Sequence, residues 1–163
     1  MNQLPITMAA AHIESGVYFI QNVGTNTVLD LANGSSADGT RIQGFAKRQL
    51  SDPWVSAQLW IITQVGHDSP VYTIRNAKSC SYADLFESNV VNGTPIVGYH
   101  GTWHPNQHWI FTMGNCGSGY VSIRNLATGT YIDLDSGNSA NGAPVVGWSG
   151  LFNRNQLWFL VRV

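Results

Sequence analysis

The chain repeats one pattern three times at constant spacing. In each copy an asparagine is followed after 8 residues by an aspartate, after 9 more by a glycine, and after 5 more by a second glycine. A Gln-x-Trp element then closes the copy, and its tryptophans, Trp60, Trp109 and Trp158, lie 49 residues apart. A period of this length without a helical pattern is typical of repeat proteins, in which similar units bury one shared core. We therefore expect a fold with threefold symmetry.

Each copy contains four short runs of β-forming residues separated by turn residues. In the third copy these runs span residues 120–124, 130–134, 144–148 and 157–161. Three copies give twelve strands, and we expect an all-β fold in which a closed barrel is capped by hairpins, because closure removes exposed sheet edges. The expected divisions are an N-terminal arm at 1–15 and repeats at about 16–69, 70–118 and 119–163.

Composition limits the classes of partner. The 163 residues suffice for one domain, only 10% of them are charged, and the net charge is −1. Because the eight basic residues are scattered along the chain, we expect no nucleic-acid partner. The start lacks a signal-peptide pattern and no segment is apolar enough to span a bilayer, so we expect a leaderless protein, cytoplasmic or released without a leader. Cys80 and Cys116 either form one bridge or remain two thiols.

The three Gln-x-Trp elements, in register with an aspartate and a Gly-aromatic pair, resemble the ricin-B-type β-trefoil lectins. The segment from Asp30 to Phe45 is especially similar to mushroom agglutinins of that family. The resemblance covers residues 16–163 and implies a β-trefoil of twelve short strands. It also implies that the Gln and Trp of each Gln-x-Trp are structural, with the indole in the core. Sugar binding is then expected from other residues of each repeat.

An aromatic residue follows each repeated aspartate after 15 residues. The pairs are Asp30 and Phe45, Asp84 and Tyr99, and Asp133 and Trp148. A sugar presents hydroxyls that donate and accept, together with an apolar face of C–H bonds. A carboxylate accepts the hydroxyl protons, a carboxamide donates in return, and an aromatic ring covers the apolar face. The offset matches the stacking aromatic of ricin-B-type sites.

In that family a polar residue before the Gln of Gln-x-Trp completes the site. The second repeat has Asn106 and the third has Asn155, whereas the first has Ala57. We therefore predict two complete sugar sites, Asp84 with Tyr99 and Asn106, and Asp133 with Trp148 and Asn155. His104 is expected to add a hydrogen bond in the second site.

The first repeat is expected to hold a weaker third site, formed by Asp30 and Phe45. Its segment between Gly44 and Gln58 is five residues longer than in the other repeats. This longer loop either blocks the pocket or helps to replace the missing amide, with Gln43, Gln49 or Ser51 as the candidate donors.

These residues predict a non-enzymatic lectin. The resemblance implies terminal galactose or N-acetylgalactosamine on glycoproteins or glycolipids as ligands, and multivalent agglutination of cells in defence. Whether the chain forms a homodimer stays open. Glycoside hydrolysis needs two carboxylates roughly 5–10 Å apart across one bond, and threefold symmetry places the repeated aspartates on separate lobes.

No metal or cofactor is expected. His100, His104 and His108 are evenly spaced, but Gly101 and Pro105 interrupt the helix that would align them. Two other functions remain open: a trefoil protease inhibitor acting through loop 47–56, and an interaction module whose sugar sites have decayed.

Overall fold

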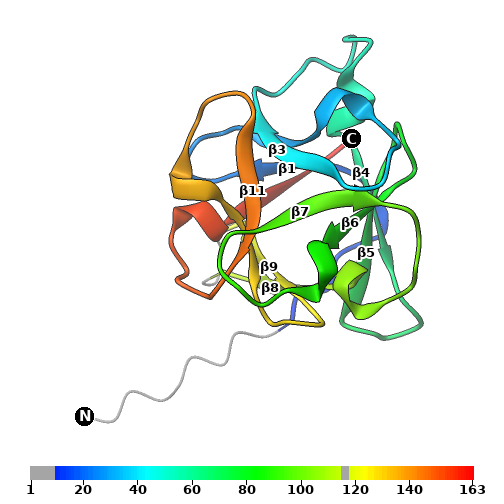
Figure 1. The fold of residues 1–163 in the computed structure, drawn as a ribbon, viewed down its shortest axis with the longest axis vertical. Helices are drawn as coiled ribbons and strands as arrows, with labels where there is room; N and C mark the ends of the chain where they lie inside the picture. Colours follow the sequence, from blue (N-terminus) through cyan, green and yellow to red (C-terminus); the bar gives the residue numbers. More distant parts are fainter. Residues whose placement is uncertain (1–9, 115–117) are drawn as a thin grey trace.

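The computed structural model describes residues 10–114 and 118–163 (Figure 1). Regular structure in these residues consists of twelve strands and short 3-10 turns. The first repeat contains β1 (Gly16–Asn22), β2 (Val28–Leu31), β3 (Thr40–Phe45) and β4 (Trp60–Gln64). The second contains β5 (Val71–Asn76), β6 (Tyr82–Leu85), β7 (Thr94–Tyr99) and β8 (Trp109–Met113). The third contains β9 (Tyr120–Asn125), β10 (Tyr131–Leu134), β11 (Ala143–Trp148) and β12 (Trp158–Arg162). The prediction of twelve strands is thereby confirmed, and the third-repeat strand bounds lie within one residue of those expected.

The first and last strands of the three repeats form a closed barrel. Around the ring, β1 pairs β4, β4 pairs β5, β5 pairs β8, β8 pairs β9, β9 pairs β12, and β12 pairs β1, all antiparallel. The middle strands form the hairpins β2–β3, β6–β7 and β10–β11. Strands β3, β7 and β11 also pair with one another across repeat boundaries, which joins the three hairpins into a cap.

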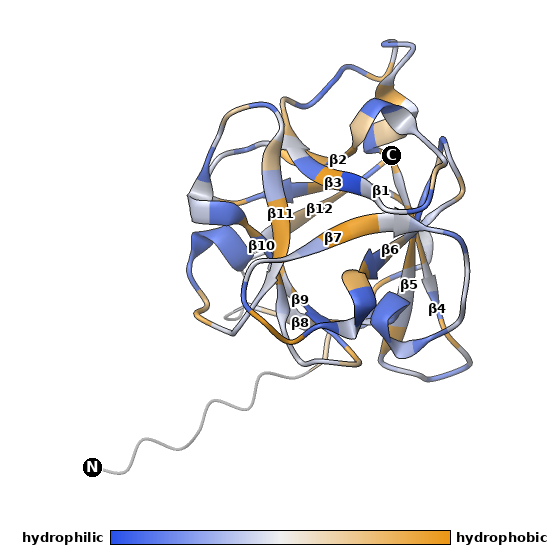
Figure 2. Cartoon of the chain, in the orientation of Figure 1, coloured by the Kyte–Doolittle hydropathy of each residue, from blue (hydrophilic) through white to orange (hydrophobic). Residues whose placement is uncertain are grey.

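The three repeated tryptophans lie in the hydrophobic core. Trp60, Trp109 and Trp158 are almost completely buried, as the sequence predicted for the closing tryptophans. In Figure 2 the cap strands β7 and β11 carry hydrophobic stretches. Alternating side chains along such strands turn toward the shared core.

The second glycine of each repeat has a packing role in this cap. A Cβ on Gly98 would lie 2.7 Å from Cδ1 of Leu31, in the preceding repeat. Gly44 and Gly147 face leucines of their neighbouring repeats at 2.7 and 2.6 Å in the same way. The constant Gly spacing in the sequence therefore reflects close contact between hairpins.

Part of the N-terminal arm packs on the barrel. Ala10 pairs with Thr112, and the Ala11 amide donates to the Phe111 carbonyl at 2.8 Å. The Ile13 amide donates to the Tyr72 hydroxyl at 2.9 Å. Because Ala11 and Ile13 are buried with the main core, residues 10–13 belong structurally to the same domain.

Three further expectations concern membrane-spanning helices, metal ligands and the two cysteines. Within residues 10–114 and 118–163, no helix is long and apolar enough to cross a membrane. The same residues contain no cluster of three His, Cys, Asp or Glu side chains arranged to hold a metal. Cys80 is exposed and its thiol is free, whereas Cys116, its alternative partner, lies outside the described residues.

Candidate functional site

Strand register explains why the aspartate and the aromatic residue of each repeat belong together. Asp84 on β6 lies opposite Val97 on β7, and Tyr99 is two residues beyond Val97. Residues two apart on a strand share a face, so the Asp84 and Tyr99 side chains lie on the same side of the hairpin. The register is the same in the other repeats, where Asp30 is opposite Gln43 and Asp133 is opposite Val146. The offset of 15 residues is thus the path through one hairpin.

The Gln-x-Trp element holds each aspartate in place. Gln107 Nε2 donates to Asp84 Oδ2 at 2.9 Å, and Trp109 Nε1 donates to the carbonyl of Ala83, the preceding residue, at 3.0 Å. The other repeats have the same bonds, from Gln58 and Gln156 to Asp30 and Asp133, and from Trp60 and Trp158 to Leu29 and Ile132. Both side chains are structural, as expected, and the glutamine also orients the carboxylate.

The second-repeat site is a hollow larger than that of the first repeat. This hollow, of about 500 Å³, is lined by Asp84, Phe86, Glu87, Tyr99, His100, Thr102, His104 and Asn106. Asn106 Nδ2 donates to Asp84 Oδ1 at 2.8 Å, so both oxygens of the buried carboxylate accept an amide. All four residues predicted for this site line one hollow. Glu87, whose side chain is exposed, lines the same hollow.

Four residues of this hollow were not predicted for the sugar site, and two of them, His100 and Thr102, are held by specific contacts. His100 lies beside the aromatic Tyr99, with ring centroids 4.7 Å apart, and its Nδ1 is 2.7 Å from Asp38 Oδ2 of the first repeat. Thr102 donates its backbone N–H to Gln107 Oε1 at 3.0 Å. His100 directly follows the stacking aromatic in sequence, and that adjacency was the signal available for finding it.

The third repeat differs in its amide. Asp133 accepts a hydrogen bond from Gln156, but the side chain of Asn155 donates none to it among the described contacts. The Asn155 Oδ1 instead lies beside Gly137, 2.7 Å from where a Cβ would stand. Trp148 is half-buried and pairs across the hairpin with Tyr131. Asp133 and Trp148 therefore share a face as predicted, whereas the Asn155 amide does not reproduce the Asn106 contact.

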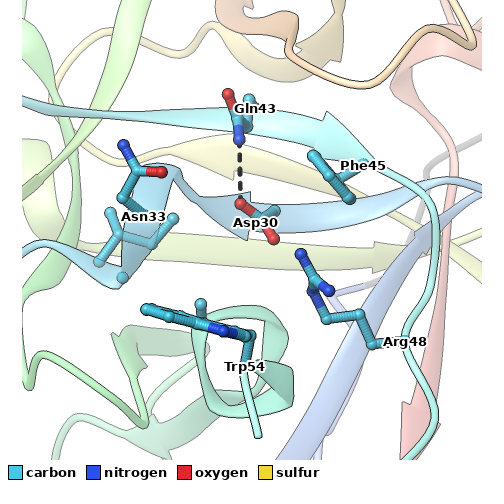
Figure 3. Close-up of a pocket in the computed structure, with 9 residues that line it drawn as sticks. Asp30, Asn33, Gln43, Phe45, Arg48 and Trp54 are labelled. Carbon is cyan, nitrogen blue, oxygen red and sulfur yellow. Dashed lines mark hydrogen bonds between the residues drawn. The ribbon is translucent and has the colours of Figure 1, made fainter. Parts of the chain in front are cut away.

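The first repeat recovers the missing amide from its own hairpin. Gln43 Nε2 donates to Asp30 Oδ1 at 3.0 Å (Figure 3), so this oxygen accepts a side-chain amide as Asp84 Oδ1 does from Asn106, although Gln43 reaches it from β3. Of the three candidate donors for this repeat, the structure uses Gln43, which lies directly opposite Asp30 in the strand register. The hollow here is about 210 Å³ and includes Asp30, Phe45 and two residues that were not predicted, Arg48 and Trp54.

The longer loop of the first repeat forms a wall of this hollow. Trp54 lies below Asp30 in Figure 3, and Arg48 is turned toward the carboxylate. Asp52 fixes both residues: its Oδ1 accepts the Trp54 amide at 2.8 Å and its Oδ2 accepts from Arg48 Nη1 at 3.2 Å. The loop therefore folds onto its own repeat and leaves the pocket open.

Burial makes the three carboxyl groups harder to ionise than free aspartates. It raises the pKa of Asp84, while hydrogen bonds from Gln107 and Asn106 oppose the rise. Burial also raises the pKa of Asp30 and Asp133. In the first repeat the nearby charge of Arg48 acts in the opposite direction. A ligand hydroxyl that donates to the carboxylate would favour its ionised form.

Sequence and structure comparisons identify known proteins that share this repeat pattern and fold. The family model of ricin-type beta-trefoil lectin domain-like proteins matches residues 6–99 and 105–163. The Rhizoctonia solani agglutinin is 27% identical, with a TM-score of 0.80 over 95% of this chain and 100% of that one. The Macrolepiota procera ricin B-like lectin, solved in complex with lactose, is 26% identical, with a TM-score of 0.74 over 94% and 100% of the two chains.

A third similar structure is an enzyme. An exo-beta-1,3-galactanase from Clostridium thermocellum is 27% identical with a TM-score of 0.80, and the likeness covers 94% of this chain but only 31% of the galactanase. Most of the galactanase chain therefore lies outside the likeness. The fold predicted from the repeats is confirmed as a β-trefoil, and the chain belongs to the ricin-type beta-trefoil lectin-like family.

Proposed function

We propose that the protein is a non-catalytic lectin that binds terminal galactose or N-acetylgalactosamine residues of glycoproteins and glycolipids. The observation that carries this proposal is the second-repeat hollow, where the buried Asp84 carboxylate, the Asn106 amide and the Tyr99 ring meet. A sugar hydroxyl pair would donate to Asp84, and Tyr99 would cover the apolar face of the ring. Family membership supports sugar binding, and the lactose complex of the Macrolepiota procera lectin supports a galactoside.

The third repeat is proposed as a second sugar site, through Asp133 and Trp148. Single shallow sites of this kind should bind monosaccharides at roughly millimolar Kd, about −4 kcal/mol. Strong attachment would then need several sites on one multivalent surface, so agglutination of glycan-coated cells is the activity we propose.

Calorimetric titration with galactose, N-acetylgalactosamine, lactose and mannose tests this function. Wild-type protein should bind the first three sugars, and Asp84→Ala/Asp133→Ala should lose nearly all binding of neutral galactosides while remaining folded. Each aspartate accepts charge-assisted hydrogen bonds worth roughly 1.5–3 kcal/mol. A protein that binds mannose equally well, or a double variant that binds galactosides unchanged, would contradict the proposed specificity or the proposed sites.

The protease-inhibitor alternative is tested in the same preparation. An inhibitor of that kind acts through an exposed loop, whereas here Trp54 and Arg48 of loop 47–56 line a pocket of their own repeat. Inhibition of a protease panel by a wild-type protein that binds no sugar would favour the alternative.

A further inference from the structure

We propose that the first-repeat pocket binds galactosides that carry an anionic group, a carboxylate or a sulfate, and that Arg48 is the residue that selects them. This inference rests on the proposed lectin function and assigns a separate ligand class to the repeat whose sequence predicted the weakest site.

Arg48 occupies a position that is structurally equivalent in all three repeats. Its backbone N–H donates to Gln58 Oε1 at 2.8 Å, as Thr102 donates to Gln107 and Leu151 donates to Gln156. Each of the three donors follows the second glycine of its repeat by four residues. Only the first repeat therefore presents a guanidinium at this position of the site.

The Arg48 guanidinium is only partly satisfied. Its Nη1 donates to Asp52, its Cζ lies 5.1 Å from the centroid of the Phe45 ring, and its buried Nε has no hydrogen-bond partner among the described atoms. A guanidinium has five N–H donors in a planar fork that matches the paired oxygens of a carboxylate or sulfate. A small rotation of the half-buried side chain would bring its free edge to such a group.

Asp30 leaves this edge available. Its two oxygens accept from Gln43 and Gln58, and no ion pair joins it to Arg48 among the described residues. A ligand can then place ring hydroxyls against Asp30 and an anionic substituent against Arg48. The second repeat has no such cation: the Asn106 Nδ2 group already donates to Asp84 and to the Leu85 carbonyl, so this amide offers a ligand only its Oδ1 acceptor, which suits a neutral hydroxyl.

The surroundings contain a second positive charge. Lys78, in the turn between β5 and β6, places its Nζ 4.7 Å from the centroid of the Trp54 ring, and its side chain lies beside Gly34, at the Asn33 end of the pocket and away from Arg48. The nearest additional carboxylate, Asp52, is already paired with Arg48 and bonded to the Trp54 amide. Arg48 is therefore the cation that favours an anion over a neutral group at its own end of the pocket, and Lys78 adds positive charge at the other end.

Two indoles allow the first and third sites to be monitored separately in the native protein. Trp54 lines the first-repeat pocket and Trp148 is the aromatic of the third site. We would follow their 15N-labelled indole N–H signals by NMR during titration with lactose, 3′-sialyllactose and 3′-sulfated lactose. The variant Arg48→Gln removes the charge, Arg48→Lys keeps the charge without the planar fork, and Arg41→Gln on the exposed side of β3 is the matched control.

We expect the Trp54 signal to report a Kd at least about tenfold lower for the acidic lactosides than for lactose, because charge-assisted bonds to arginine are strong. This preference should weaken as salt is added. Arg48→Gln should abolish it, Arg48→Lys should reduce it, and Arg41→Gln should leave it unchanged. Trp148 should show no such preference in any of these proteins.

Three results would overturn the inference while leaving the lectin proposal intact. They are equal affinities for lactose and the acidic lactosides at Trp54, a preference that survives Arg48→Gln, and ligand-induced shifts at Trp148 without any at Trp54. If none of the lactosides shifts either indole or binds by calorimetry, the lectin proposal itself fails, and this inference fails with it.

Discussion

At the scale of single residues, the repeated glutamine links the core to the site. The Gln107 amide nitrogen donates to Asp84 and to the His100 carbonyl, and its oxygen accepts the Thr102 N–H. One buried side chain therefore holds both the carboxylate and the loop beside it. The sequence indicated a structural role for Gln107, but the bond to Asp84 depends on the strand register, which becomes visible only in three dimensions.

We predict that Gln107→Glu destabilises the protein in a strongly pH-dependent way. The new carboxyl would lie about 3 Å from Asp84, and two carboxylates that close cannot both ionise, so the folded state keeps a shared proton and the pKa of the pair rises. The unfolded chain loses that proton above about pH 4. The penalty is therefore small below this pH, grows as the pH rises toward the pKa of the folded pair, and reaches about 3 kcal/mol near neutrality.

Urea unfolding at pH 3.5 to 7 measures this difference. Gln49→Glu adds the same charge on the exposed loop of the first repeat and should change the free energy of unfolding by less than about 0.5 kcal/mol at every pH. A Gln107→Glu penalty that is equal at all pH values would mean that the glutamate does not share its site with Asp84.

At the scale of elements, the three turns after β2, β6 and β10 share an unusual backbone. Each contains two successive residues with positive φ, which are Asn33 and Gly34, Glu87 and Ser88, and Ser136 and Gly137. The second repeat alone has no glycine in this pair, although Ser88 has a φ of 53°. Left-handed backbone is unfavourable for any residue with a Cβ.

We therefore predict that Ser88→Gly stabilises the protein by about 0.5–1 kcal/mol, because relief of left-handed strain outweighs the extra backbone entropy of glycine in the unfolded chain. Urea unfolding midpoints at constant m-value provide the measurement. Ser35→Gly is the control, since Ser35 has a φ of −68° and its hydroxyl accepts the Ala37 amide. A loss of stability in Ser88→Gly as large as in Ser35→Gly would show that strain at Ser88 is not limiting.

Neighbouring repeats are joined by the asparagine that opens each copy. Asn125 is fully buried; its Nδ2 donates to the Asn106 carbonyl at 2.9 Å and its Oδ1 accepts the Ala127 N–H. Asn76 reaches the Ala57 carbonyl in the same way, and Asn22 of the first repeat reaches the carbonyl of Asn155 in the third. These contacts close a ring of three repeats and position the residue before each Gln-x-Trp.

We predict that Asn125→Ala lowers the free energy of unfolding by about 2–4 kcal/mol, because it leaves the buried Asn106 carbonyl and the partly buried Ala127 N–H without their partners and opens a small cavity at a fully buried position. It should also weaken galactoside binding at the second site, since it releases the backbone of Asn106. Urea unfolding and titration with lactose measure the two effects. Asn138→Ala, which removes an exposed bond to the Ala140 amide, should cost less than about 1 kcal/mol and leave binding unchanged.

The elements also show what sequence could predict. Constant spacing in the sequence indicated the strands, the repeated glycines of the cap and the aspartate–aromatic pairs, because each depends on distance along one hairpin. Three features could not be predicted with certainty, since they depend on how a loop or a turn packs in three dimensions. They are the Gln43 bond, the orientation of Arg48 and the missing Asn155 contact. Sequence therefore predicted which residues of each repeat share a face of its hairpin, whereas the Gln43 and Arg48 contacts of the first repeat became visible only in the structure.

At the scale of the whole molecule, threefold symmetry separates the sites. Each Asp–aromatic pair belongs to its own hairpin, and the hairpins β2–β3, β6–β7 and β10–β11 meet around one cap (Figure 1). With sugar bound at the proposed sites, one chain would contact several glycans at once. The gain from a second contact depends on effective concentration and requires no new interaction within either site.

This separation predicts that agglutination and monosaccharide binding respond differently to the loss of one site. On cells stripped of sialic acid, where the proposed ligands of the first repeat are depleted, Asp133→Ala should lower the agglutination titre more than tenfold, because avidity commonly exceeds single-site affinity by about 10²–10⁴. The same variant should leave the Kd of lactose at the second site within about twofold of wild type, since sites on different hairpins act independently.

The titres of variant and wild type are compared for protein that is a monomer in solution, which light scattering establishes. Glu14→Ala, far from the hairpin cap in the exposed pair with Arg162, is the matched control and should change neither quantity. Equal titres for monomeric Asp133→Ala and wild type would show that the third repeat does not contribute to crosslinking.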